Sequence, residues 1–105
     1  MRRLLIPLLL LTPLAAAAEL AADRKAELVH MLRQDCGACH GMTLKGGLGA
    51  PLLPENLSGK PVETLQATIL YGRAGTPMPP WEGLLSEEEA GYLAHLLKQG
   101  VPDVR

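Results

Sequence analysis

The chain has 105 residues, which predicts a single domain. It carries 10 basic and 11 acidic residues, for a net charge of −1, and so lacks the basic excess typical of nucleic-acid-binding proteins. It contains no Phe, one Trp and two Tyr, which are few aromatic side chains for a small hydrophobic core. A large apolar cofactor would supply much of what such a core lacks.

The first 18 residues have the pattern of a secretory signal peptide. Arg2 and Arg3 precede an apolar stretch over residues 4–14, and four small residues at 15–18 provide a cleavage site. The apolar stretch is too short and too rich in proline for a membrane span. We therefore predict export to the periplasm, cleavage after Ala18 and a single domain over residues 19–105. Loss of the two arginines leaves eight basic and eleven acidic residues.

Three segments are predicted to form helices. Residues 21–34 are rich in strong helix formers and contain no Gly or Pro. Residues 61–71 begin with Pro and are followed by Gly, which suits a helix start and stop. Residues 86–98 open with Ser86 and Glu89, which form a capping box sequence. No segment has a convincing strand pattern, so the sequence predicts an all-α fold.

The sequence Cys36-Gly-Ala-Cys39-His40 is the pattern at which haem c is attached. Positions three apart lie on one side of a helical turn, so both thiols can reach one edge of a porphyrin. His40 then projects toward the iron as a ligand. A disulfide would need a very short ring here, and a thioredoxin-like thiol site expects strands around the helix. We therefore predict one haem c, bound covalently through Cys36 and Cys39.

Residues 41–60 are rich in glycine and are predicted to form an irregular loop. A loop of this length usually serves a function or wraps a ligand. The carbonyl of Pro51 is a candidate acceptor for the second ring nitrogen of His40, which would fix the orientation of the ring. Four leucines of the loop could line one wall of the haem: Leu44, Leu48, Leu52 and Leu53.

A proline-rich loop near residue 78 offers a second iron ligand. Met78 is flanked by Pro77, Pro79 and Pro80, each of which fixes its own φ and so orders the backbone around the thioether. We predict Met78 as the sixth ligand, with His95 in the last helix as the alternative. Trp81 either packs on the haem edge or on this loop, or serves as a plain hydrophobic anchor.

Taken together, these residues resemble a class I cytochrome c over the whole mature chain. The resemblance implies about four helices wrapped around one covalently attached haem, with the first and last helices crossing near Gly91 and Tyr92. It implies that His40 and Met78 ligate the iron and that Pro51 supplies the carbonyl partner of His40. Tyr71, at the end of the middle helix, is a further candidate for contact with the haem.

A narrower resemblance involves Asp35, the run Gly46-Gly47-Leu48-Gly49, the run Pro54-Glu55-Asn56-Leu57 and the segment Pro79-Pro80-Trp81. These are similar to the small monohaem cytochrome of bacterial denitrification gene clusters, which lies beside the haem-cd type nitrite reductase. The resemblance implies electron donation to that reductase or assistance in maturing its special haem. The family usually has Pro-Pro before Leu52, whereas this chain has Ala50-Pro51.

The sequence therefore predicts a periplasmic one-electron carrier that is not an enzyme. We expect a monomer whose partners are redox proteins, with nitrite reductase as the candidate, and no nucleic acid or membrane insertion of the mature chain. A methionine opposite a histidine raises the reduction potential of haem iron. The alternatives are a haem-maturation protein, and a sensor or enzyme if the sixth position of the iron is open.

Overall fold

The computed structural model describes residue 10 and residues 19–102, and every regular element in this part of the chain is helical. The elements are α1 Ala22–Met31, the π-helical turn η1 Leu32–Cys36, α2 Gly37–His40, α3 Pro54–Leu57, α4 Val62–Tyr71 and α5 Glu87–Gln99. The predicted all-α class is confirmed. The predicted signal peptide, apart from residue 10, lies outside the described residues.

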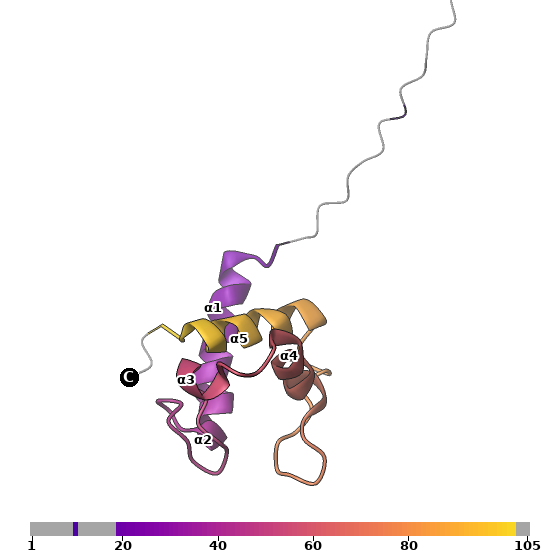
Figure 1. Ribbon diagram of the computed structural model, residues 1–105. Coiled ribbons are helices and arrows are strands. Elements are labelled where there is room, and N and C mark those ends of the chain that lie inside the picture. The colour runs from indigo at the N-terminus through magenta and orange to yellow at the C-terminus, as the bar shows by residue number, and fades with distance from the viewer. Residues whose placement is uncertain (1–9, 11–18, 103–105) are drawn as a thin grey trace, which may run out of the picture.

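Elements α1, η1 and α2 form one continuous rod that carries the cysteine–histidine motif at its end (Figure 1). The rod therefore extends past Gln34, where the sequence predicted the first helix to stop. Within it, the Gly37 N–H donates to the Leu32 carbonyl five residues earlier, which defines a π turn. The buried positions Leu28, Leu32 and Gly37 are spaced four and then five residues apart. The wider second spacing matches the π turn, which contains one residue more than an α-helical turn.

The rod crosses α5, whose start is fixed by the predicted capping box. The Ser86 hydroxyl accepts from the Glu89 N–H at 3.1 Å, and the Glu89 carboxylate accepts from the Ser86 N–H at 2.9 Å. Glu89 also pairs with Arg24 of α1, and this guanidinium holds the pKa of the Glu89 carboxyl below its ordinary value. Lys25 lies 5.6 Å from the ring centroid of Tyr92. The implied crossing of the first and last helices near Tyr92 is thus observed.

Helix α4 packs against α5 and contributes Leu65, Ile69 and Leu70 to the buried core. The residue that comes closest to Gly91 is Gln66 of α4: a β-carbon at Gly91 would lie 3.3 Å from its Nε2. That amide donates to the Glu87 carbonyl at 2.7 Å. Gly91 therefore leaves room for a side chain of α4.

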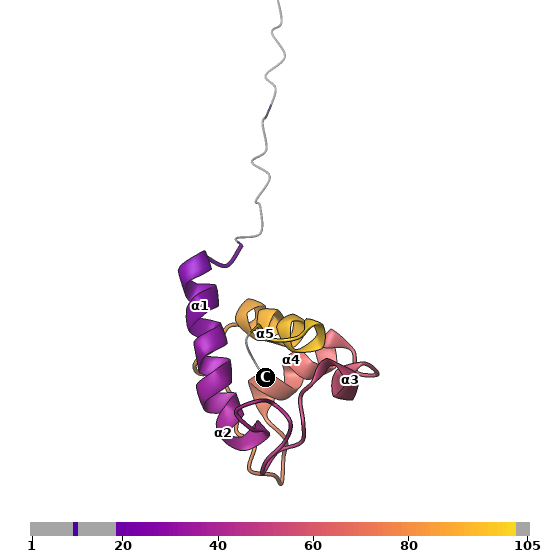
Figure 2. The same cartoon turned by 90° about the vertical axis from the view of Figure 1, so that its left-hand side faces the viewer.

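Two loops extend from the helices toward the same end of the molecule. One follows α2 and the other follows α4, and both lie at the foot of the two views in Figures 1 and 2. The loop after α2 contains a short helix, α3, that the sequence reading missed; the Asn56 side chain accepts from the Leu53 N–H at its start. In the described part of the chain, no helix has the length and apolar character needed to cross a membrane.

Candidate functional site

Both cysteines of the motif are free thiols at the end of the rod. Cys36 is half-buried, whereas Cys39 is exposed. Burial, together with the neighbouring Asp35 carboxylate, raises the pKa of the Cys36 thiol to about 11. Neither sulfur atom is tied up in a disulfide, so both are available for thioether bonds.

The ring of His40 is held by the backbone of the loop that follows it. Its Nδ1 lies 2.6 Å from the carbonyl oxygen of Ala50, so Nδ1 carries the proton and Nε2 is left with its lone pair free for a metal. The predicted acceptor, Pro51, is therefore wrong by one residue. Proline restricts the residue before it to extended backbone, and in this conformation the Ala50 carbonyl faces the ring.

Backbone hydrogen bonds fold the loop after α2 onto the motif. Gly46 N–H donates to the His40 carbonyl and Gly49 N–H to the Cys39 carbonyl, both at 2.8 Å. A β-carbon at Gly47 would lie 2.7 Å from the Cys39 oxygen, and one at Gly41 would lie 2.6 Å from the Gly46 oxygen. In the sequence alone, these glycines indicate only an irregular loop. The high proportion of glycine in this loop was the available signal that two backbone segments pack closely against each other here.

The loop around Met78 is closed by contacts at both of its ends. Gly72, at φ +68°, lies so close to the far side of the loop that a β-carbon there would be 2.6 Å from the Met78 oxygen. The same oxygen accepts from the Arg73 N–H at 3.3 Å. At the other end, the Trp81 N–H donates to the carbonyls of Ile69 and Leu70 at 3.1 and 3.0 Å. Met78 itself is half-buried.

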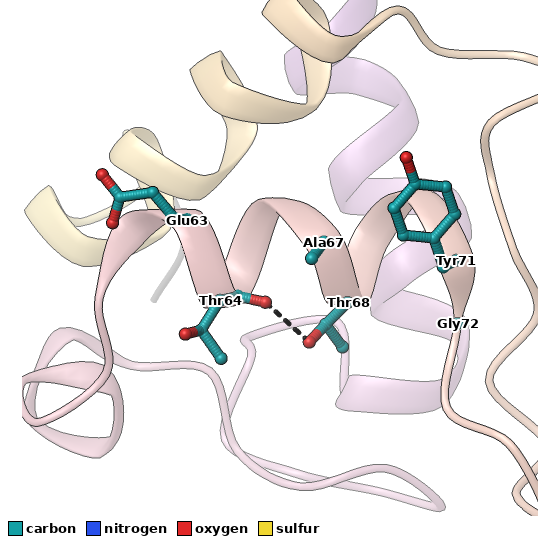
Figure 3. A pocket seen from close by; sticks show the side chains of 6 residues that line it. All are labelled: Glu63, Thr64, Ala67, Thr68, Tyr71 and Gly72. Carbon is teal, nitrogen blue, oxygen red and sulfur yellow. Dashed lines mark hydrogen bonds between the residues drawn. The ribbon is translucent and has the colours of Figure 1, made fainter.

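An open hollow of about 520 Å³ runs along α4 to the start of this loop. Figure 3 shows Thr64 and Thr68 pointing to one side of the helix, where the Thr68 hydroxyl donates to the Thr64 carbonyl at 2.8 Å. Tyr71, at the loop end, is 59% exposed. Its contact with a haem stays a prediction. The hollow is lined by Glu63, Thr64, Ala67, Thr68, Tyr71 and Gly72.

The remaining predicted site residues lie apart from this end or pack on the core. His95, the alternative ligand, is exposed on α5, whose buried face is formed by Ala90, Leu93, Ala94 and Leu97. Trp81 is half-buried and packs against the core cluster. Of the loop leucines, Leu44 belongs to the core, while Leu48 is 92% exposed. His40 thus ends α2, Met78 lies in the loop after α4, and His95 lies on α5.

Comparison with known proteins identifies the family. The family model described as cytochrome c oxidase, cbb3-type, subunit III matches residues 23–97. Cytochrome c55X of Pseudomonas aeruginosa is 61% identical over 79 residues, which are 75% of this chain and 66% of that protein. Cytochrome c55X of Paracoccus denitrificans is 48% identical over 99 residues, covering 93% of this chain and 96% of that protein. The chain belongs to the cytochrome c55X family of c-type cytochromes.

A solved structure of a c-type cytochrome, NirC, supports the same fold. It superposes with a TM-score of 0.75 at 59% identity, covering 76% of this chain and 94% of that one. A more distant structure, dihydro-heme d1 dehydrogenase NirN in complex with DHE, superposes with a TM-score of 0.64 at 40% identity. The match covers 70% of this chain but only 16% of NirN. The predicted cytochrome c fold is confirmed.

Members of this family bind haem c covalently, as the motif predicted. The residues present fit that cofactor: two free thiols lie three positions apart at the end of one rod. The adjacent imidazole has its Nδ1 occupied by a carbonyl and its Nε2 free. This donor set is the one that thioether attachment and axial ligation require.

Proposed function

We propose that this cytochrome carries single electrons in the periplasm and is not itself an enzyme. Cys36 and Cys39 would hold the haem, and His40 and Met78 would ligate its iron. The bound haem supplies the redox chemistry, because its iron alternates between two oxidation states. The observation that carries the proposal is the hydrogen bond from His40 Nδ1 to the Ala50 oxygen, which prepares Nε2 as a ligand.

The Met78 loop supports a carrier function in a second way. A thioether is a weak ligand, so a loop already ordered around it lowers the entropic cost of binding. Its prolines fix φ, the Met78 carbonyl accepts from the Arg73 N–H within the loop, and the Trp81 N–H donates to carbonyls of α4. With both ligands held by such contacts, the site has little to rearrange when an electron arrives or leaves.

We propose the haem-cd type nitrite reductase as the partner. The cytochrome, as a monomer, would form a short-lived complex with it. Support comes from the relatives: the chain is 30% identical over 103 residues to a nitrite reductase of Stutzerimonas stutzeri, covering 86% of this chain and 18% of that protein. The likeness is thus confined to a small part of that protein.

A second candidate function is help in maturing the reductase's special haem. The observation that favours it is the 38% identity, over 94 residues, to a dihydro-heme d1 dehydrogenase of Pseudomonas aeruginosa. This chain covers 18% of that protein, so the likeness is confined to a small part of it. In this role the cytochrome would accept electrons from, or pass them to, an enzyme of haem oxidation.

Absorption spectra of the exported holoprotein test the ligation. We expect a c-type spectrum, a far-red sulfur-to-iron band when oxidised, and no change of the reduced spectrum with carbon monoxide. Met78→Ala should remove the far-red band and admit carbon monoxide, whereas His95→Ala should behave as wild type. A wild-type protein that binds carbon monoxide readily would contradict Met78 ligation and favour a sensor or enzyme.

A deletion strain separates the two candidate functions. Loss of the special haem from nitrite reductase would assign this cytochrome to maturation. A reductase with normal cofactor content that is reduced more slowly in periplasmic extracts, and is restored by added reduced cytochrome, would assign it to donation. Unchanged cofactor content and unchanged reduction would contradict both.

A further inference from the structure

A glycine in the loop after α2 lies directly against the ring of His40. A β-carbon built at Gly49 would be 2.8 Å from both Nδ1 and Cε1 of the imidazole and 3.2 Å from Cγ. Distances this short to three consecutive ring atoms are possible only above the ring plane, because an atom approaching in the plane would be much farther from Cγ. The missing methyl group would therefore sit on the face of the ring.

The backbone of Gly49 is not free to retreat from the ring. Its N–H donates to the Cys39 carbonyl at 2.8 Å, and its carbonyl accepts from the Gly47 N–H at 3.0 Å. The next carbonyl along the chain, that of Ala50, accepts from Nδ1 of the same imidazole. Moving Gly49 outward would strain all three bonds at once.

The two contacts constrain different motions of the imidazole. The hydrogen bond to Ala50 holds one ring atom in place but leaves the ring able to tilt about that bond. The backbone of Gly49, pressed on one face, blocks the tilt in that direction. We propose that Gly49 is a positioning residue for His40, which sets the tilt of the imidazole plane and hence the direction of Nε2.

A larger residue at this position would have to displace the ring. Carbon atoms in contact normally lie about 3.5–4.0 Å apart, so a methyl group at 2.8 Å would push the imidazole by nearly 1 Å. Gly49 has no positive φ, so alanine would add this contact without backbone strain of its own. The effect of Gly49→Ala is therefore steric and directed at His40.

The chain offers two matched controls. Gly47→Ala adds a methyl group 2.7 Å from the Cys39 oxygen, in the same loop but against backbone rather than against the ring. Gly83→Ala adds one where nothing lies within 4 Å. Neither control residue has a positive φ. Gly47→Ala thus shows the effect of disturbing the loop without touching the ring. Gly83→Ala shows the effect of a glycine-to-alanine substitution that makes no new contact.

The test compares the oxidised holoproteins by the NMR shifts of the haem methyl groups and by the anisotropy of the EPR signal, which both depend on the imidazole plane. We expect Gly49→Ala to change the order of the methyl shifts, Gly83→Ala to match wild type, and Gly47→Ala to lower the melting temperature while keeping the wild-type order. A wild-type order in Gly49→Ala, or the same altered order in Gly47→Ala, would overturn the proposal.

A measurement on the unaltered protein covers the case in which Gly49→Ala fails to fold or to bind haem. In the reduced wild-type holoprotein, a strong nuclear Overhauser effect should join a Gly49 α-proton to the Cε1 proton of His40, and its absence would overturn the proposal. The inference rests on the proposed role of His40 as an iron ligand. If His40 were not bound, its ring protons would lack the shifts caused by the haem, which distinguishes failure of that role from failure of this one.

Discussion

Replacing Gly72 by alanine tests whether close backbone contact keeps the Met78 loop shut. Gly72 ends α4 at φ +68° and ψ −166°, a conformation that residues with a side chain rarely adopt. A β-carbon there would lie 2.6 Å from the Met78 oxygen and 2.8 Å from the Pro79 carbonyl carbon. The substitution therefore strains the backbone and separates the two sides of the loop.

The size of the effect follows from these two terms. A residue forced into such a region costs on the order of 1–3 kcal/mol. Relieving the clash moves the Met78 carbonyl away and breaks its bond with the Arg73 N–H, which costs about 1 kcal/mol more. A total of about 3 kcal/mol raises the open fraction of the loop about 100-fold. Gly75→Ala is the matched control, because Gly75 has φ +76° but nothing within 4 Å. It should cost about 1 kcal/mol and raise the open fraction about 5-fold.

The assay is the rate at which added imidazole replaces the sixth ligand in the oxidised holoprotein, followed through loss of the far-red band. When the loop opens and closes faster than imidazole binds, this rate is proportional to the open fraction. We expect it to rise about 100-fold in Gly72→Ala and about 5-fold in Gly75→Ala. Equal rates in the two variants would show that the clash with the Met78 oxygen does not open the loop. A wild-type rate in Gly72→Ala would show that neither the clash nor the backbone strain does.

Three further predictions concern charge and capping. The lowered pKa of Glu89 means that its pair with Arg24 adds stability at pH values above the ordinary carboxyl pKa of 4.5. This stability should be lost as the pH falls through the lower, folded-state pKa, and Glu89→Gln should flatten the acid limb of the melting-temperature profile. Ser86→Ala should cost about 1 kcal/mol, read as a melting temperature about 4–8 °C lower; an unchanged value would mean that the cap is not formed. Residues 41–53 and 72–81 contain no acid, and Lys45 and Arg73 there are exposed. Reversing both charges to Glu should therefore slow oxidation by the anion ferricyanide several-fold at low ionic strength, with no difference in high salt.

The sequence predicted the helices well because each has a local cause. Helix α5 was expected over residues 86–98 and spans Glu87–Gln99, since Ser86 caps it and Gly100 ends it. Helix α4 was expected over 61–71 and spans Val62–Tyr71. The first helix extends past its predicted end because the chain stays helical through the π turn at Leu32–Cys36 and through α2, although Gly37 is a weak helix former.

The motif predicted the chemistry of the site but not the contacts that orient it. Residue types and spacing identify two tethering thiols and an imidazole, whatever the surrounding backbone does. Whether Ala50 or Pro51 meets the ring depends on the register of a loop held by backbone hydrogen bonds, which any residue can make. Gly49 was missed for the same reason: a glycine in a turn and a glycine beneath a ring look alike in a sequence.

The burial pattern explains why the helices could be foreseen while the loops could not. In the described part of the chain, ten of the twelve buried hydrophobic residues lie in the helices, and only Leu44 and Leu85 lie outside them. In residues 41–53 the only buried side chain is that of Leu44, and residues 72–81 have none. These two loops are shaped by hydrogen bonds, by glycines that allow close approach and by prolines. A large apolar group bound between such loops would give them the packing that their own side chains do not provide, which is how a chain so poor in aromatic residues can hold a haem.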